Sequence, residues 1–137
     1  HPDHEETLRA IEQAVTLAAG GMTPKQAIRQ LGQGWVAEEA LAISIYCALV
    51  ADDFRKAVIL AVNHDGDADS TGAITGNLLG AMYDVEAIPE NWLEPLELRE
   101  VIREITDDLY DSKGWAIGEY SADTELNRKI WKKYPGF

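Results

Sequence analysis

The sequence has little sulfur and no long apolar run, and both absences restrict what the protein is. Its single cysteine, Cys47, cannot form an internal disulfide, so the chain suits a reducing compartment. No apolar run approaches the roughly 20 residues that span a bilayer, and the first residues lack a signal-peptide pattern. We therefore expect a cytoplasmic protein that does not enter the membrane, with Cys47 buried and inert.

Basic side chains are also scarce. Twelve lysines and arginines stand against 24 aspartates and glutamates, which gives a net charge of -12. A protein that binds the nucleic-acid backbone needs clustered positive charge, so this composition argues against a nucleic-acid partner. The 137 residues, 46% of them hydrophobic, are enough for one domain with its own core.

Helical periodicity runs through almost the whole chain and predicts an all-α fold. Helix starts and ends are marked by Thr23-Pro24, by the acidic pair before Phe54, and by glycines after residues 19 and 31. The predicted helices are residues 5–19, 24–31, 35–51, 54–62, 71–83, 96–110 and 124–133, with a turn around Trp92 and a loop at 114–123. The segment 35–51 is apolar on nearly every side, so we expect it in the middle of the core.

Two of these segments carry further expectations. Glycine inside a helix is unfavourable by roughly 1 kcal/mol relative to alanine, so the fourfold spacing of Gly72, Gly76 and Gly80 predicts a closely packed neighbouring helix. The 96–110 segment and the last helix are amphipathic, and we expect their apolar side chains to face inward: Leu98, Val101, Ile102, Ile105, Leu109, Leu126, Ile130 and Trp131.

Three aspartates at alternate positions, Asp65, Asp67 and Asp69, lie between an apolar run and the glycine-spaced segment. On a non-helical turn, alternate side chains project to one side, so the three carboxylates are expected to converge and to need a cation between them. Carboxylate, hydroxyl and carbonyl oxygens suit hard cations such as Mg²⁺, Ca²⁺ or Mn²⁺. We expect Asp69 or Ser70 to cap the helix that follows.

Two known motifs match part of this turn. An EF-hand loop would need glycine at Ser70 and a glutamate at Gly76, so the match fails at both positions. Asp67-Ala68-Asp69-Ser70-Thr71 fits the Asp-x-Asp-x-Thr motif of haloacid-dehalogenase-type phosphotransferases, which remains a weaker alternative. That motif follows a strand directly in a doubly wound sheet, and this sequence lacks the alternating strand-helix pattern.

A longer resemblance covers roughly residues 1–110. The segment from Ala61 to Ala81, read as Asn63-His64-Asp65-Gly66-Asp67-Ala68-Asp69-Ser70-Thr71 followed by a small-residue helix, resembles the C-terminal signature of the ADP-ribosylglycohydrolase family. The segments 32–41 and 88–92 resemble the usual flanks of that signature. One departure is Asp65, which stands where the family usually has glycine.

This resemblance implies an orthogonal all-α bundle with a binuclear Mg²⁺ or Mn²⁺ centre at the base of an ADP-ribose cleft. By motif position, Asp67, Asp69 and Ser70 are the metal ligands of this chain. The substrate-binding candidates are Asn63, Asp65, Gly66, Gly34 and Trp35. The implied activity is hydrolysis of the glycosidic bond between ADP-ribose and an acceptor.

The family also takes metal ligands from an N-terminal Thr-Asp-Asp-Thr motif and an early acidic segment, and neither occurs in this sequence. The chain also begins with His1, so we expect the other half of the site, including the catalytic acidic residue, in a removed segment or a second chain. The isolated chain is then inactive. Apolar residues such as Ile43, Leu49 and Leu79 are expected to be uncovered and to favour dimerisation. The alternative is a noncatalytic helical protein derived from the family.

Other notable side chains have simpler interpretations. His64 is expected to form hydrogen bonds in the turn, because no second histidine or cysteine lies at ligand spacing. Trp35 and Trp92 are expected to pack rather than to stack on an adenine or ribose. Glu38 and Glu39 are explained by their favourable position near a helix N-terminus.

Overall fold

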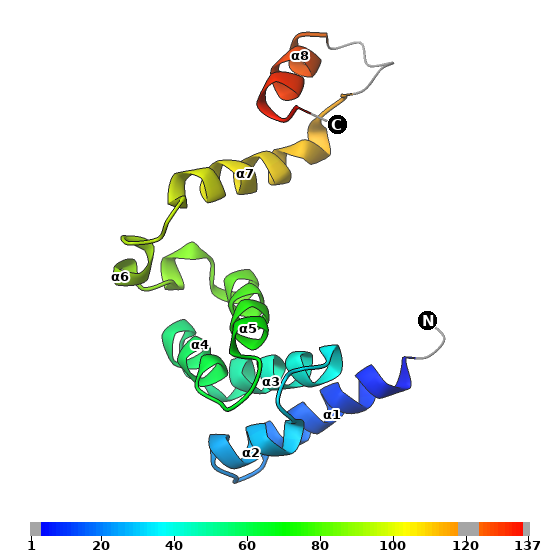
Figure 1. Ribbon diagram of the computed structural model, residues 1–137, viewed down its shortest axis with the longest axis vertical. Helices are drawn as coiled ribbons and strands as arrows, with labels where there is room; N and C mark the ends of the chain where they lie inside the picture. The colour runs from blue at the N-terminus through cyan, green and yellow to red at the C-terminus, as the bar shows by residue number, and fades with distance from the viewer. Residues whose placement is uncertain (1–3, 118–123, 136–137) are drawn as a thin grey trace. The chain divides into compact units, whose positions relative to one another are not determined.

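The structure, a computed structural model, describes residues 4–117 and 124–135, and in those residues it is all-α (Figure 1). The chain divides into two compact units, residues 1–94 and 95–137. None of the described helices is long and apolar enough to cross a membrane. The cytoplasmic location stays a prediction.

The first unit contains the helices that position the aspartate turn. These are α1 (Glu5–Ala19), α2 (Pro24–Leu31), α3 (Ala37–Val50), α4 (Phe54–Val62) and α5 (Ala68–Tyr83), followed by the 3-10 turn η1 (Val85–Ala87) and the short helix α6 (Glu90–Leu93). The predicted limits of α1, α2 and α4 are confirmed. Trp92, predicted to lie in a turn, is on α6, and its ring meets Phe54 edge-on at 6.5 Å between centroids.

Helix α3 is the centre of this unit, as its nearly uniform apolarity predicts. It packs against α1, α2, α4 and α5 (Figure 1). Its side chains Ile43, Tyr46 and Cys47 are buried, and burial raises the pKa of the Cys47 thiol to about 12. A thiol held in its protonated form is a poor nucleophile, which agrees with the inert role expected for Cys47.

The expectation of uncovered core faces is wrong for two of its three residues. Ile43 and Leu79 are buried, and only Leu49 is exposed. Helices α3 and α5 cover each other, so this unit closes a core without a second chain. Dimerisation stays a prediction that no longer rests on Ile43 or Leu79.

The glycine spacing of α5 has a packing reason at one position only. A Cβ atom at Gly72 would lie 2.7 Å from Cγ1 of Val62 on α4, whereas at Gly76 and Gly80 it would meet nothing within 4 Å. The expectation of close helix approach is therefore confirmed at Gly72 and wrong at Gly76 and Gly80, where the space beside the glycine is open.

The second unit contains α7 (Arg99–Asp111), the 3-10 turn η2 (Ser112–Gly114) and α8 (Thr124–Lys133). The predicted limits of α8 are confirmed, and Ile130 is buried. The predicted loop spans residues 114–123, of which 118–123 lie outside the described residues. Lys133 joins the two helices through ion pairs to Glu104, at 2.6 Å, and to Asp108, which also accepts a hydrogen bond from Tyr134.

The predicted inward faces of this unit are mostly wrong. Exposed side chains include Trp131 on α8 and five residues of the 96–111 region, namely Leu98, Val101, Ile102, Ile105 and Leu109. Amphipathic periodicity identifies the apolar side of a helix, but burial needs a neighbour on that side. The ion pairs of Lys133 fix α8 to α7 without covering this apolar face.

The start of α4 provides a test of local stability. The Asp53 side chain accepts a hydrogen bond from the Lys56 backbone N–H at 2.7 Å, which lowers the pKa of Asp53 below its ordinary value of 3.8. We expect Asp53→Ala to melt a few degrees below the parent at pH 7. Because the folded-state pKa is lowered, this difference is full above the unfolded pKa and disappears as the pH falls through the folded value.

Circular-dichroism melting of Asp53→Ala and Asp52→Ala at several pH values checks this prediction. Asp52 also forms an ion pair with Lys56 but does not cap the helix, so its loss should have little effect. Equal melting shifts for the two variants would contradict the capping role.

Candidate functional site

The aspartate turn is a five-residue loop, residues 63–67, between α4 and α5. Asp67 is the N-cap residue of α5, so Asp69 and Ser70 lie in the first helical turn instead of capping it as predicted. Helix α5 begins earlier because the Thr71 N–H bonds to the Asp67 carbonyl at 3.3 Å. Asp67, Asp69 and Ser70 therefore lie within one turn at the N-terminal end of a 16-residue helix.

The Asp67 and Asp69 side chains lie close enough to share a hydrogen bond. This bond is the main cause of a lowered pKa at Asp67, followed by a hydrogen bond to the Ser70 side chain. The positive end of the helix dipole also favours negative charge at this position. Two carboxylates and a hydroxyl are a donor set that fits a hard divalent cation, and they supply three of the six oxygens that Mg²⁺ prefers.

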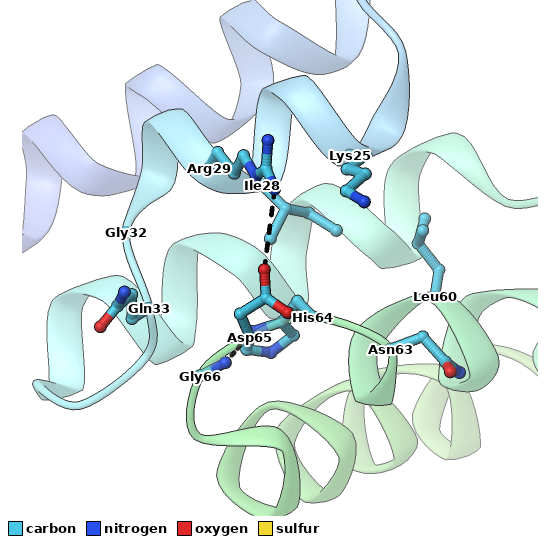
Figure 2. Close-up of a pocket in the computed structure, with 10 residues that line it drawn as sticks. All are labelled: Lys25, Ile28, Arg29, Gly32, Gln33, Leu60, Asn63, His64, Asp65 and Gly66. Carbon is cyan, nitrogen blue, oxygen red and sulfur yellow. Dashed lines mark hydrogen bonds and ion pairs between the residues drawn. The ribbon is translucent and has the colours of Figure 1, made fainter.

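Asp65 does not join them. Its carboxylate faces the Arg29 guanidinium of α2 at 3.7 Å, and both side chains are mostly exposed (Figure 2). Within residues 4–117 and 124–135, no three acidic, histidine or cysteine side chains could hold one metal ion. The expectation that three aspartates converge is therefore wrong. It assumed a non-helical turn in which alternate side chains project to one side, but Asp65 lies in the loop whereas Asp69 lies in a helix.

The helical context also removes the two other motif interpretations. Gly76, at the last ligand position of an EF-hand loop, lies in the middle of α5. The phosphotransferase motif needs a strand before it and a doubly wound sheet around it. The segment before Asp67 is α4, and the described part of the chain contains no strand. The phosphotransferase alternative is therefore wrong.

His64 and Thr71 tie the two ends of the loop together. The Gly66 N–H donates to His64 Nδ1 at 3.1 Å (Figure 2), so in the neutral ring the proton is on Nε2. Nε2 then donates to the Thr71 hydroxyl at 2.9 Å, and that buried hydroxyl donates to the Ala61 carbonyl at 2.7 Å. The predicted hydrogen-bonding role of His64 is confirmed.

A second loop, residues 32–36 between α2 and α3, holds the aspartate turn from the other side. The Glu39 carboxylate accepts hydrogen bonds from the backbone N–H groups of Gln33 and Gly34, both at 3.0 Å. The Gln33 carbonyl in turn accepts the Asp67 N–H at 2.8 Å. The sequence analysis missed this role of Glu39, because a glutamate near a helix start already has a sufficient local explanation.

Glycine allows these two loops to touch. A Cβ atom at Gly66 would lie 1.8 Å from the Gln33 carbonyl oxygen, so no other residue fits without a backbone shift. Gly34 is buried with φ +82°, and a Cβ atom there would lie 3.2 Å from Thr71 Cγ2. The structure therefore places both predicted glycines beside Asp67, where they serve packing. Their substrate contacts stay predictions.

The remaining substrate-binding candidates are divided between two places. Asn63, Asp65 and Gly66 line a cavity of about 240 Å³ beside α2 (Figure 2). Trp35 does not line it. Its side chain is 67% exposed, so the packing role expected for Trp35 is wrong, whereas Trp92 is packed as predicted. The contact of Trp35 with a ligand stays a prediction.

Known proteins resemble the chain over a long segment that includes both loops of the candidate site. The family model for ADP-ribosylglycohydrolase matches residues 1–117. The chain belongs to the ADP-ribosylglycohydrolase family. Members of this family use metal ions and act on ADP-ribosylated substrates. No solved structure matches the chain.

Three relatives show the extent of the similarity. An uncharacterized protein of Archaeoglobus fulgidus is 34% identical over 116 residues, 78% of this chain. The ADP-ribosyl-[dinitrogen reductase] glycohydrolase of Rhodospirillum rubrum is 46% identical over 59 residues, 41% of this chain. An ADP-ribosylarginine hydrolase of Pseudomonas putida is 27% identical over 113 residues, 80% of this chain. The matches cover 37%, 20% and 30% of these relatives, so the chain spans only part of their length.

Two glycines give a matched test of the loop contact. We expect Gly66→Ala to destabilise the fold by about 1–3 kcal/mol, because its methyl group would overlap the Gln33 carbonyl. Gly76→Ala should instead stabilise α5 by up to about 1 kcal/mol, since its methyl group enters open space. Urea unfolding of both variants measures the two effects, and a Gly66→Ala protein as stable as the parent would disprove the loop contact.

Two adjacent glutamates test the anchoring of the second loop. Glu39→Ala removes the acceptor of two backbone N–H groups and should lower the free energy of unfolding by about 2 kcal/mol. Glu38→Ala removes the same charge from the same helical turn and should have a smaller effect. Equal losses in urea unfolding would show that Glu39 acts only through the helix dipole.

Proposed function

We propose that this chain supplies the C-terminal half of a divalent-metal centre in a hydrolase that cleaves the glycosidic bond between ADP-ribose and an acceptor. The observation that carries this proposal is the grouping of Asp67, Asp69 and Ser70 in the first turn of α5. Membership of the ADP-ribosylglycohydrolase family supports the reaction class.

Two carboxylates and a hydroxyl from these three side chains would hold Mg²⁺ or Mn²⁺, and a completed site would hold two ions. A bound divalent cation supplies Lewis-acid polarisation of a ribose oxygen or of a water molecule. The remaining ligands and the catalytic acidic residue come from a segment or chain beyond these 137 residues.

The anchored loops orient these ligands. The backbone of Asp67 is held by the Gln33 carbonyl, and the loop conformation before it is held by His64. Gly34 brings the chain close to Asp67, and the next residue, Trp35, has an exposed indole that is available for contact with a base or ribose. Preorganised ligands bind a cation with less loss of conformational freedom.

The second candidate is a noncatalytic helical protein derived from the family, in which the aspartates only shape the turn. It is favoured by the lack of a three-ligand cluster of acidic, histidine or cysteine side chains in the described residues. The two functions differ in metal binding, which is measurable on the chain as it exists.

Titration calorimetry with Mn²⁺ makes this distinction. We expect weak binding, with a Kd of about 0.1–1 mM because the chain offers only three ligands, and loss of the heat in the Asp67→Ala and Asp69→Ala double variant. The control is an Asp107→Ala and Asp111→Ala double variant, which removes two exposed carboxylates from α7 and should retain binding. A parent protein that gives no heat supports the noncatalytic function.

The incomplete ligand set also makes a prediction about activity. The purified chain should release no ADP-ribose from an ADP-ribosylated protein in the presence of Mn²⁺ or Mg²⁺, because it lacks the second half of the site. Chromatographic detection of free ADP-ribose tests this. Robust release by the chain alone would show that the described residues are sufficient for catalysis.

A further inference from the structure

The cavity of about 240 Å³ lies between α2 and residues 63–66, and none of the three proposed metal ligands lines it. Lys25 and Arg29, one turn apart on α2, extend over it from one side (Figure 2). Ile28 points into it between them, and Leu60 of α4 adds a second apolar surface. The cavity therefore combines two cationic side chains with a lining that is partly apolar.

We propose that this cavity binds a phosphate group carried by a small molecule, as a site separate from the metal centre. Lys25 and Arg29 bring two positive charges to one cavity of a protein whose net charge is -12. The planar guanidinium of arginine binds phosphate oxygens in a bidentate manner, and a lysine ammonium adds a compact point charge. Near its second pKa a phosphate monoester carries between one and two negative charges, which matches the two positive charges of Lys25 and Arg29.

Asp65 is the one carboxylate that lines the cavity, and it opposes an anion there. Its ion pair with Arg29 is a single contact at 3.7 Å between side chains that are 65% and 86% exposed. Exposed ion pairs of this kind contribute little stability, so a phosphate displaces Asp65 from Arg29 with little loss. Removal of the Asp65 carboxylate should therefore strengthen phosphate binding. If Arg29 and Asp65 were only a solvated surface ion pair with no ligand site, no such gain would be expected.

The interior of the cavity defines the rest of the ligand. Ile28 is 3% exposed and forms the closed base of the cavity, whereas the half-buried Leu60 has apolar surface that a ring or chain attached to the phosphate can cover. A cavity of about 240 Å³ holds several times the roughly 30 Å³ that one water molecule occupies in the liquid. Phenyl phosphate, with a ring and one phosphate, is a suitable probe, and inorganic phosphate is the smaller comparison.

The test is titration calorimetry of the metal-free protein with phenyl phosphate, with EDTA present so that no metal ion bridges the ligand to Asp67. We expect measurable binding that is weakened about tenfold or more in a Lys25→Ala and Arg29→Ala double variant. An Asp65→Asn variant should bind several-fold more tightly. Inorganic phosphate should bind more weakly than phenyl phosphate.

A Lys129→Ala and Lys132→Ala double variant removes two exposed positive charges from α8 and should bind like the parent. Circular-dichroism melting of each variant reports whether its fold is kept. No binding by the parent, equal weakening in the two double variants, or no gain in Asp65→Asn would each overturn the proposal.

The result is independent of the proposed hydrolase function. An Asp67→Ala and Asp69→Ala protein should keep phenyl phosphate binding while losing Mn²⁺ binding, and the Lys25→Ala and Arg29→Ala protein should do the reverse. Loss of both ligands in either double variant would show one shared site and would overturn the separation of the two.

Discussion

The hydrogen bond from the Asp67 N–H to the Gln33 carbonyl joins the two loops on which the candidate site depends. It forms at the N-terminal end of α5, where backbone N–H groups lack partners within the helix. The bond therefore gives the Asp67 N–H a partner and also fixes the backbone of the first metal-ligand candidate. The Glu39 carboxylate holds the far side of this bond by accepting the N–H groups of Gln33 and Gly34. The loop at residues 32–36 thus acquires a defined conformation from the two hydrogen bonds that it makes to one side chain of α3.

A network of buried hydrogen bonds, formed by Ser44 and Thr71, continues this arrangement into the core between α3 and α5. The buried Ser44 hydroxyl lies 2.7 Å from the Ala40 carbonyl and 3.1 Å from the Thr71 carbonyl. The Thr71 hydroxyl is itself bonded to His64 and Ala61. Buried polar groups are favourable only when they are paired, so these bonds restrict how α5 can shift against α3. The N-terminal turn of α5 is thereby fixed relative to the core helix.

Local signals in the sequence were sufficient for most helix limits. Thr23-Pro24, the Asp53 cap and the glycines after α1 and α2 act within a few residues of the ends that they mark, so their effects are readable without a fold. They failed at α5, where Asp67 rather than Asp69 or Ser70 is the cap. Three candidates for a cap lie within four residues of that segment, and Asp67 is the one whose backbone N–H bonds to the Gln33 carbonyl.

The sequence by itself determined the all-α class, the central place of α3 and the family motif with its metal-ligand candidates, because these depend on periodicity and on the order of residues along the chain. Only the tertiary structure decided which aspartates lie together, since Asp65 turns to Arg29 across a distance of 36 residues in sequence while Asp67 and Asp69 share a helical turn. It also decided that Glu39 anchors a loop and that Lys25 and Arg29 face a cavity. Those roles depend on which neighbour each side chain meets, and no local pattern encodes that.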